Sequence, residues 1–172
     1  MVGMMGAGKT AIGAALARRL NVAFLDSDSE IETAANMTIA EIFARDGEAF
    51  FRVKEAQVIS RLLDGEPSVL STGGGAFLQA GNREAISRAG VSVWLRADIG
   101  LLWTRVKHKT TRPLLRTPNP RETLEELCRV RNPEYAKSDL VVDADPSYSI
   151  EEMTDRVIEV LLTRPDVLEH EA

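Results

Sequence analysis

The stretch that decides the fold is Gly3-Met4-Met5-Gly6-Ala7-Gly8-Lys9-Thr10, which matches the pattern G-x-x-x-x-G-K-[ST] at every position. Glycines in this pattern let backbone N–H groups turn inward at a helix N-terminus and form a cradle for phosphate. In such a cradle, Lys9 reaches the β and γ phosphates of a nucleotide, and the Thr10 hydroxyl ligates Mg²⁺. The alternative is a glycine-rich turn without a ligand. The amphipathic stretch 11–20 favours the phosphate-binding loop, because it supplies the helix that the motif requires.

Beyond this loop, short apolar runs alternate with longer amphipathic stretches. The apolar runs predict strands over 22–25, 68–71, 91–95 and 140–142. The amphipathic stretches predict helices over 9–20, 39–63, 82–89, 99–107, 121–131 and 150–162. We expect Asn132-Pro133 to interrupt the fifth helix, because proline biases the residue before it away from helix. The alternation is typical of βαβ units and predicts an α/β fold around a parallel sheet.

The length and composition fit one domain that spans 1–172. The chain has 172 residues, of which 44% are hydrophobic and 27% charged, close to the globular average. Its 26 acidic and 21 basic residues give a formal net charge of −5, so nucleic acid and anionic membranes are not expected as partners. No apolar run approaches the roughly 18 residues of a membrane helix, and no secretory leader is recognisable. We therefore expect a cytoplasmic chain, in which the single Cys128 excludes an internal disulfide.

Two carboxylates follow the first predicted strand. Asp26 and Asp28 flank Ser27 at the carboxyl end of that strand, where open parallel sheets bind ligands. Because alternate residues of a strand point the same way, both carboxylates are predicted to share one direction. One can then face Mg²⁺ and the other a substrate hydroxyl. The same residues would also cap a helix, and the two interpretations are compatible.

Two further motifs carry groups suited to a small acidic ligand. Arg52 and Glu55 are three residues apart on a predicted helix, so Glu55 can orient the Arg52 guanidinium toward a carboxylate. A solvated salt bridge is the simpler alternative for this pair. The segment 71–75 ends in three glycines after a predicted strand, which allows a ligand to approach bare backbone. A flexible turn is the alternative there.

The stretch 105–121 predicts a mobile lid. It contains no acidic residue and six basic ones, namely Arg105, Lys107, Lys109, Arg112, Arg116 and Arg121. It is rich in Thr and Pro between two predicted helices, which suits a segment that closes over phosphates and excludes water. A solvated basic loop is the alternative. A polar C-terminal tail is expected over about 164–172.

Taken in order, six motifs resemble those of shikimate kinase: G-x-M-G-A-G-K-T, D-S-D, G-E-x-x-F-R-x-x-E, T-G-G-G, T-x-R-P-L-L and R-N-P-E-Y. The resemblance covers nearly the whole chain. It implies the nucleoside-monophosphate-kinase type of P-loop fold, a three-layer α/β/α sandwich with a parallel five-stranded sheet in the order 2-3-1-4-5. The implied reaction is ATP-dependent phosphorylation of the shikimate 3-hydroxyl, a step of chorismate and aromatic amino acid biosynthesis. Shikimate and ATP are then the partners, and a monomer is the expected state.

The resemblance also implies roles for individual residues. The ATP phosphates are assigned to Gly6, Ala7, Gly8, Lys9, Thr10 and Ala11. The metal Mg²⁺ is assigned to Thr10, with support from Asp26 through water. The nucleotide is further contacted by Arg105, along the adenine, and by Arg112, which reaches the transferring phosphate from the lid.

On the substrate side, the resemblance assigns the shikimate hydroxyls to Asp28, which is also the expected proton acceptor. Arg52 and Arg131 would grip the shikimate carboxylate. The backbone of the ring pocket is assigned to Gly73, Gly74 and Gly75. The residues with a catalytic role are therefore Lys9, Asp28 and Arg112.

Two other functions remain open from the sequence. A different small-molecule kinase of the same shape, such as gluconate kinase, would not require two separated carboxylate-binding arginines together with D-S-D and T-G-G-G. A nucleotide-binding regulator without catalysis would not require the four residues Lys9, Thr10, Asp26 and Asp28. The motif set therefore favours a kinase that acts on a small hydroxy acid.

The start of the chain carries one more expectation. Only Met1 and Val2 precede Gly3, whereas a strand usually contains about five residues. A central strand of two residues would leave backbone groups of both neighbours without partners, at about 1–3 kcal/mol each. We therefore expect about five to ten residues upstream of Met1, mostly Ile, Leu and Val, as suits a strand that is buried on both faces.

Overall fold

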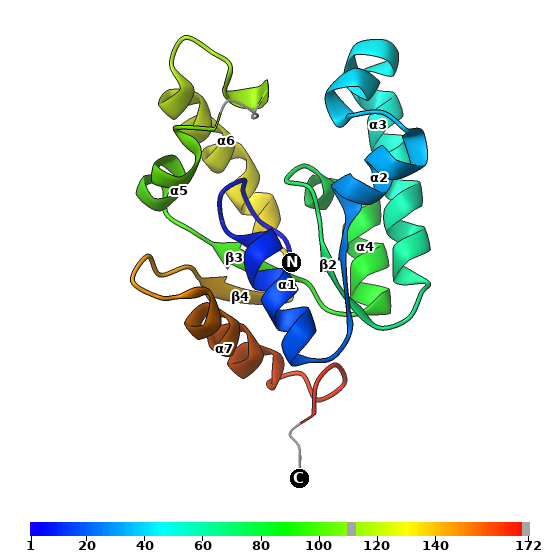
Figure 1. The fold of residues 1–172 in the computed structure, drawn as a ribbon, viewed down its shortest axis with the longest axis vertical. Helices are drawn as coiled ribbons and strands as arrows, with labels where there is room; N and C mark the ends of the chain where they lie inside the picture. The colour runs from blue at the N-terminus through cyan, green and yellow to red at the C-terminus, as the bar shows by residue number, and fades with distance from the viewer. Residues whose placement is uncertain (110–112, 170–172) are drawn as a thin grey trace.

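The computed structural model describes residues 1–109 and 113–169 (Figure 1). Its strands are β1 (Ala23–Asp26), β2 (Ser68–Ser71), β3 (Val93–Arg96) and β4 (Leu140–Asp143). They form two parallel pairs, β1 with β2 and β3 with β4. The α-helices are α1 (Lys9–Arg19), α2 (Ser27–Ala35), α3 (Ile39–Leu63), α4 (Ala80–Ala89), α5 (Ile99–Val106), α6 (Pro120–Tyr135) and α7 (Ile150–Leu161). The predicted α/β fold with parallel strands is confirmed.

The first two residues join the two strand pairs. The α-amino nitrogen of Met1 donates to the carbonyl of Leu70 at 2.7 Å, on the β2 side. On the other side, the backbone nitrogen of Val2 donates to the carbonyl of Val93 at 2.9 Å, and Leu95 donates to the Val2 carbonyl at 3.0 Å. The chain therefore enters between β2 and β3 before it turns into the glycine-rich loop.

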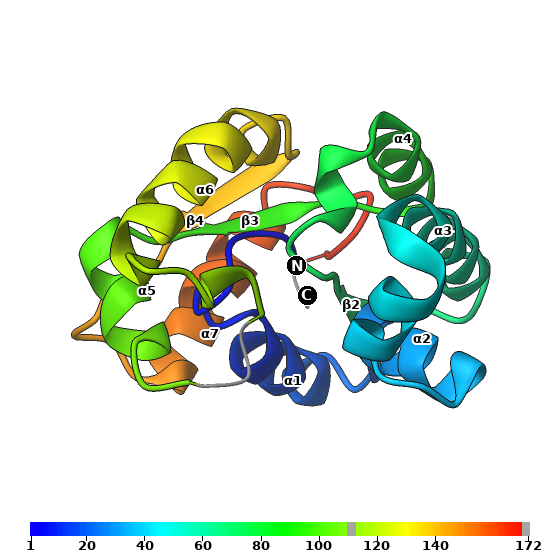
Figure 2. The ribbon, with the colours of Figure 1, turned by 90° about the horizontal axis from the view of Figure 1, so that it is seen from above.

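Helices cover both faces of the strands. Figure 2 shows α1 and α7 on one side of the strands and α4 and α6 on the other. α1 packs against α7, and α3 packs against α4. The largest apolar cluster includes the fully buried side chains of Leu95, Leu102, Leu124 and Val157, which come from β3, α5, α6 and α7. A smaller apolar cluster of Ile31, Ile42 and Phe51 fixes α2 against α3.

Helix α2 is not among the predicted helices, and two of the predicted helices differ in their course from the prediction. The expected interruption at Asn132-Pro133 is wrong, because α6 continues through Pro133 to Tyr135. Proline removes one backbone donor, but Pro133 lies in the last turn of α6, and the buried Tyr135 anchors this turn by its hydrogen bond to the Gly74 carbonyl. The long α3 has the predicted bounds, but it is kinked at Gly47, whose φ of 84° lies outside the helical region.

The two segments predicted to be irregular carry local structure. Within 105–121 the structure places the end of α5, a short 3-10 helix (Pro113–Leu115) and the start of α6, with Leu115 buried against the main core. Near the C-terminus, the backbone nitrogens of Val167 and Leu168 both donate to the carbonyl of Arg164, and Leu168 packs against the core. Among the described residues, no helix is long and apolar enough to cross a membrane.

Candidate active site

The glycine-rich loop before α1 has a backbone that only glycine adopts readily. Gly6 has a φ of +80°, and Gly8, which is the N-cap of α1, has a φ of +101°. A Cβ atom on Gly6 would also lie 2.8 Å from the Cγ1 atom of Val106 in α5. Both the conformation and the close packing therefore require glycine, and the loop ends at the N-terminus of an 11-residue helix.

Two cations lie against this loop. The Nζ atom of Lys9 donates to the carbonyls of Gly3 at 2.7 Å and Met4 at 3.1 Å. The Nη1 atom of Arg105, from the last turn of α5, donates to the carbonyl of Gly6 at 3.0 Å. The positive end of the α1 dipole lies in the same place, so the loop combines three features that favour an anion.

A cavity of about 540 Å³ opens beside the loop. Ten of the predicted site residues line it, namely Gly6, Gly8, Lys9, Thr10, Ala11, Asp26, Asp28, Gly73, Gly74 and Arg105. Ala7 is fully buried in the core behind the loop and is absent from the lining. The cavity lies at the carboxyl ends of β1 and β2, where ligands bind in open α/β sheets.

The far wall of this cavity was missed by the sequence analysis. It consists of Tyr148, Ser149, Ile150 and Met153, where the chain leaves β4 and enters α7. The sequence does hold a signal for its geometry, because Ser149 and Glu152 form a reciprocal capping box at the start of α7. That signal predicts where the helix begins, but it does not predict that the helix start faces a loop from the other end of the chain.

The structure corrects the secondary structure that was predicted for Asp26 and Asp28. The prediction that both lie on a strand is wrong for Asp28, because β1 ends at Asp26 and α2 begins at Ser27. Asp26 is the N-cap of α2, and its side chain accepts a hydrogen bond from the backbone nitrogen of Ser29 at 3.0 Å. Both carboxylates still reach the same cavity, because Asp28 lies in the first turn of that helix.

Asp28 is electrostatically perturbed. Its burial is the largest cause that raises the pKa of this carboxyl above the usual 3.8, and the neighbouring Asp26 raises it further. Lys9 and Arg52 act in the opposite direction and favour the ionised form. A carboxylate with a raised pKa is a better proton acceptor, so the site holds a group suited to general-base chemistry.

Each glycine of the 73–75 segment lies against a different charged side chain. A Cβ atom on Gly73 would lie 2.5 Å from Oδ1 of Asp28, and one on Gly74 would lie 3.0 Å from Nη1 of Arg131. A Cβ atom on Gly75 would collide with the guanidinium of Arg52. A side chain at any of the three positions would therefore displace a charged group of the cluster from its present place.

The charged groups around these glycines form one cluster. Nη1 of Arg52 donates to Oε1 of Glu55 at 2.9 Å, and Nη2 contacts Glu48 at 3.3 Å. Glu55 is only 1% exposed, and burial is the largest cause that raises its pKa, while Arg52 lowers it. Asp28 and Arg131 both influence the pKa of Glu55, so all of these groups are close together. The alternative of a solvated salt bridge at Arg52 and Glu55 is therefore wrong.

The site joins an anion-binding loop to a compact set of two arginines and a carboxylate. Arg52, Gly75 and Arg131 do not line the cavity itself, and they adjoin it through Gly73 and Gly74. The predicted catalytic Arg112 lies outside the described residues. Chemically, the arrangement can bind polyphosphate at one end and a small acid with hydroxyl groups at the other.

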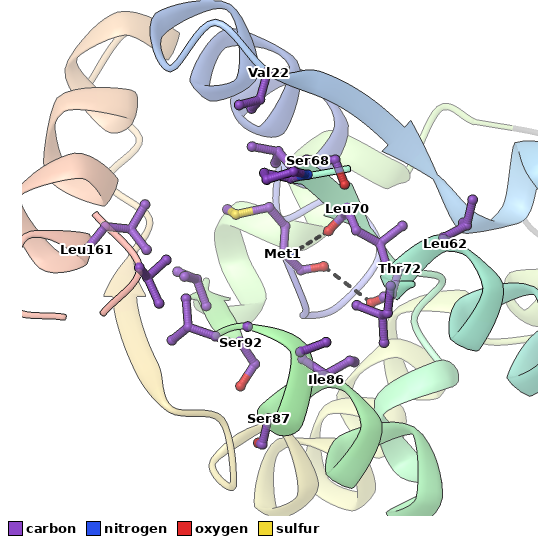
Figure 3. Close-up of a pocket in the computed structure, with 18 of the residues that line it drawn as sticks. Met1, Val22, Leu62, Ser68, Leu70, Thr72, Ile86, Ser87, Ser92 and Leu161 are labelled. Carbon is purple, nitrogen blue, oxygen red and sulfur yellow. Dashed lines mark hydrogen bonds between the residues drawn. The ribbon is translucent and has the colours of Figure 1, made fainter. Parts of the chain in front are cut away.

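A second cavity, of about 550 Å³, lies at the opposite ends of the strands. Figure 3 shows Met1 among the residues that line it, with hydrogen bonds from Met1 to Leu70 and from Thr72 to Met1. Its lining contains none of the candidate site residues that the structure describes. The two cavities are distinct, and among the described residues only Thr72 lines both.

Comparison with known sequences identifies relatives of this chain. The sequence profile described as shikimate kinase matches residues 5–162. The chain belongs to the shikimate kinase family. A shikimate kinase of Cereibacter sphaeroides is 68% identical over 169 residues, which cover 98% of this chain and 84% of the relative. A shikimate kinase of Ruegeria pomeroyi is 66% identical and covers 98% of this chain and 87% of the relative.

Solved structures of the family have the same fold. A shikimate kinase from Acinetobacter baumannii in complex with shikimate has a TM-score of 0.88 and 36% identity, covering 98% of this chain and 93% of that chain. A shikimate kinase from Aquifex aeolicus has a TM-score of 0.81 and 30% identity, covering 96% and 95% of the two chains. The resemblance inferred from the six motifs is thus confirmed at the level of family and fold.

Proposed function

We propose that this chain transfers the γ-phosphoryl group of ATP to the 3-hydroxyl of shikimate, with shikimate 3-phosphate and ADP as products. The observation that carries the proposal is the arrangement of Asp28, Arg131 and Arg52 around the three glycines, directly beside the phosphate-binding loop. A hydroxyl acceptor and two guanidinium groups match the two kinds of polar group on a small hydroxy acid. Membership of the shikimate kinase family supports this choice of substrate.

Arg52 and Arg131 bind the shikimate carboxylate. Both guanidinium groups lie at the glycine segment, and Glu55 holds Arg52 by a hydrogen bond of 2.9 Å. A planar guanidinium can offer two parallel N–H donors to one carboxylate, which a lysine ammonium cannot do. The backbone of Gly73, Gly74 and Gly75 lines the ring pocket beside them.

Asp28 binds the shikimate hydroxyls and accepts the proton of the attacking hydroxyl. It lies in both places that this role requires, in the cavity beside Lys9 and against Gly73. Its raised pKa brings its proton affinity closer to the pH at which it must act.

The nucleotide occupies the loop end of the cavity. The ATP phosphates bind to the segment Gly6, Ala7, Gly8, Lys9, Thr10 and Ala11, and Lys9 neutralises charge that develops on the transferring group. Arg105 contacts the loop through the carbonyl of Gly6, and this contact supports its assignment to the adenine side of the nucleotide. Arg112 completes the catalytic set from a lid that spans about 105–121.

Mg²⁺ is the expected metal. Among residues 1–109 and 113–169, no three His, Cys, Asp or Glu side chains could hold a metal by themselves. The donors that do line the cavity are oxygens, the Thr10 hydroxyl and the Asp26 carboxylate, and such a set fits a hard cation that takes its other ligands from phosphate and water. Thr10 and Asp26 would hold it, and it would supply charge neutralisation between the phosphates.

We further propose the finer architecture that the family resemblance implied. The sheet has five parallel strands in the order 2-3-1-4-5, in which the segment ending at Val2 is the central strand. The backbone hydrogen bonds of Met1 and Val2 to β2 and β3 support this order. The chain is one domain, acts as a monomer in the cytoplasm, and has shikimate and ATP as its small-molecule partners.

The proposal is tested by following ADP release with ATP and each of three acceptors: shikimate, gluconate and a nucleoside monophosphate. We expect turnover with shikimate to exceed turnover with the other two by at least about 10³. Arg52→Lys should raise the KM for shikimate and leave the KM for ATP unchanged. Faster turnover with gluconate or a nucleoside monophosphate would overturn the assignment.

A further inference from the structure

The tyrosine of the R-N-P-E-Y motif has no role in the mechanism above, yet it is one of the most deeply buried side chains. Tyr135 is 0% exposed, and its Oη atom donates a hydrogen bond of 2.6 Å to the carbonyl of Gly74. It lies one helical turn after Arg131, and a Cβ atom on Gly74 would lie 3.0 Å from Nη1 of Arg131 and 3.5 Å from Oη of Tyr135, so both side chains pack against the same glycine. Tyr135 therefore links the guanidinium that would bind the substrate carboxylate to the backbone against which that guanidinium packs.

The other side of the same segment is held by a second buried hydroxyl. The backbone nitrogen of Gly73 donates to Oγ of Ser27 at 3.2 Å, and Ser27 is completely buried between β1 and α2. Ser27 therefore fixes the glycine that lies against Asp28, and Tyr135 fixes the glycine that lies against Arg131. Two elements that are distant in sequence thus anchor the two ends of the Gly73–Gly74 unit.

We propose that Tyr135 is a positioning residue that sets the affinity for the substrate carboxylate, because it holds the Gly74 carbonyl at a fixed position relative to the Arg131 guanidinium. This inference deepens the proposed function and rests on it. Glycine has no side chain with which to restrict its own backbone, so the position of this segment depends on its hydrogen bonds. Loss of the tyrosine hydroxyl would leave a partly buried carbonyl without this partner, and the segment would move to recover one.

The inference predicts a selective effect of Tyr135→Phe, which removes only the hydroxyl. We expect the KM for shikimate to rise about 5- to 15-fold, as expected for the loss of one net hydrogen bond. The kcat and the KM for ATP should change less than about twofold, because the phosphate-binding loop and Asp28 keep their contacts. Val142→Ala, which truncates a buried residue of β4 away from the site, is the control for a purely structural loss.

A neutral substrate analogue sharpens the test. Shikimate in which the carboxylate is replaced by a primary amide keeps its hydroxyls but lacks the charge that Arg131 would bind. We expect the wild-type protein and Tyr135→Phe to have the same KM for this amide within about twofold. Ser27→Ala, at the Asp28 end, should instead raise the KM for shikimate and for the amide by similar factors.

The outcomes separate the two proposals. If the wild-type protein does not phosphorylate shikimate, the proposed function itself is wrong. If it does, and Tyr135→Phe leaves the KM for shikimate unchanged or raises the KM for the amide equally, the positioning role is overturned. If Tyr135→Phe lowers the melting temperature no more than Val142→Ala and only Tyr135→Phe changes the KM for shikimate, the positioning role is supported. If Tyr135→Phe does not fold, the KM values of Ser27→Ala for shikimate and for the amide provide the test. A rise in the KM for shikimate alone would show that the Asp28 end of the segment also affects the carboxylate, and this would contradict the separate roles proposed for Ser27 and Tyr135.

Discussion

The two cavities of this molecule have nearly the same volume, but their linings differ in chemistry. The cavity at the carboxyl ends of the strands is lined by Lys9, Asp26, Asp28 and Arg105, together with four glycines. The cavity at the opposite ends is lined mainly by apolar side chains, and of its charged residues Glu66, Arg88 and Asp166 are exposed, while Arg164 pairs with Asp166 at 2.7 Å. Burying charged groups is costly unless they are paired or used. The comparison teaches that the partly buried charged groups, and not the volume, distinguish the candidate active site.

The largest expected effect comes from Asp28→Asn, which keeps the size of the side chain and removes its ability to accept a proton. Turnover with shikimate should fall by about 10²–10⁴. Because the folded-state pKa of Asp28 is raised, its ionisation opposes folding at neutral pH. The protonated Asp28 carboxyl contributes to the stability of the folded state at low pH, and this contribution is lost as the pH rises through the folded-state pKa. The variant should therefore melt above the wild-type protein at pH 8, and the difference should shrink toward pH 4.

The turnover of Asp28→Asn is measured by single-turnover kinetics, and its melting temperature is measured from pH 4 to pH 8. A variant that is inactive but less stable at pH 8 would contradict the electrostatic explanation. Near wild-type turnover would remove Asp28 from the catalytic set.

A somewhat smaller effect is expected from Lys9→Met at the phosphate-binding loop. The ammonium of Lys9 lies against two loop carbonyls, from which it can contact a bound phosphate. Turnover should fall by about 10²–10³, the usual loss when one preorganised cationic donor is removed. The matched control is Lys137→Met, which removes an exposed cation paired with Glu134 on α6. Equal kinetics in the two variants would argue against the loop as the phosphate site.

An intermediate effect is expected from Glu55→Gln, which keeps the shape of a buried side chain but removes the charge that holds Arg52. We expect the KM for shikimate to rise about 5- to 20-fold, since a charge-assisted hydrogen bond becomes a neutral one. The kcat should remain within about threefold of the wild-type value. Glu48→Gln, at the exposed contact of the same guanidinium, is the control and should change KM less than about twofold.

The smallest kinetic effect is expected at the second cavity. Ile86→Ala enlarges that cavity and removes a buried side chain, so the free energy of unfolding should fall by about 2–5 kcal/mol. At a temperature where the variant is fully folded, kcat and both KM values should stay within about twofold. Denaturant unfolding and steady-state kinetics measure the two quantities. A selective change in the KM for shikimate or ATP would show that the two cavities are not independent.

The sequence by itself determined much of the local structure and the family. The glycine-rich loop, the helix after it and the alternation of strands and helices follow from short-range patterns, and β2 and α3 have the predicted bounds. Such patterns act through backbone conformation and the period of apolar side chains, which neighbouring residues set largely by themselves. The pair Arg52 and Glu55 was recognised for the same reason, because three residues separate neighbours on a helix.

Only the tertiary structure decided which distant groups meet. It placed Asp28 on α2 instead of on a strand, carried α6 through Pro133 to Tyr135, and brought the start of α7 to the phosphate-binding loop. It also set each of the three glycines against one charged side chain from another element. These contacts join residues that are tens of positions apart, so they depend on how the layers pack, and no local pattern encodes that packing.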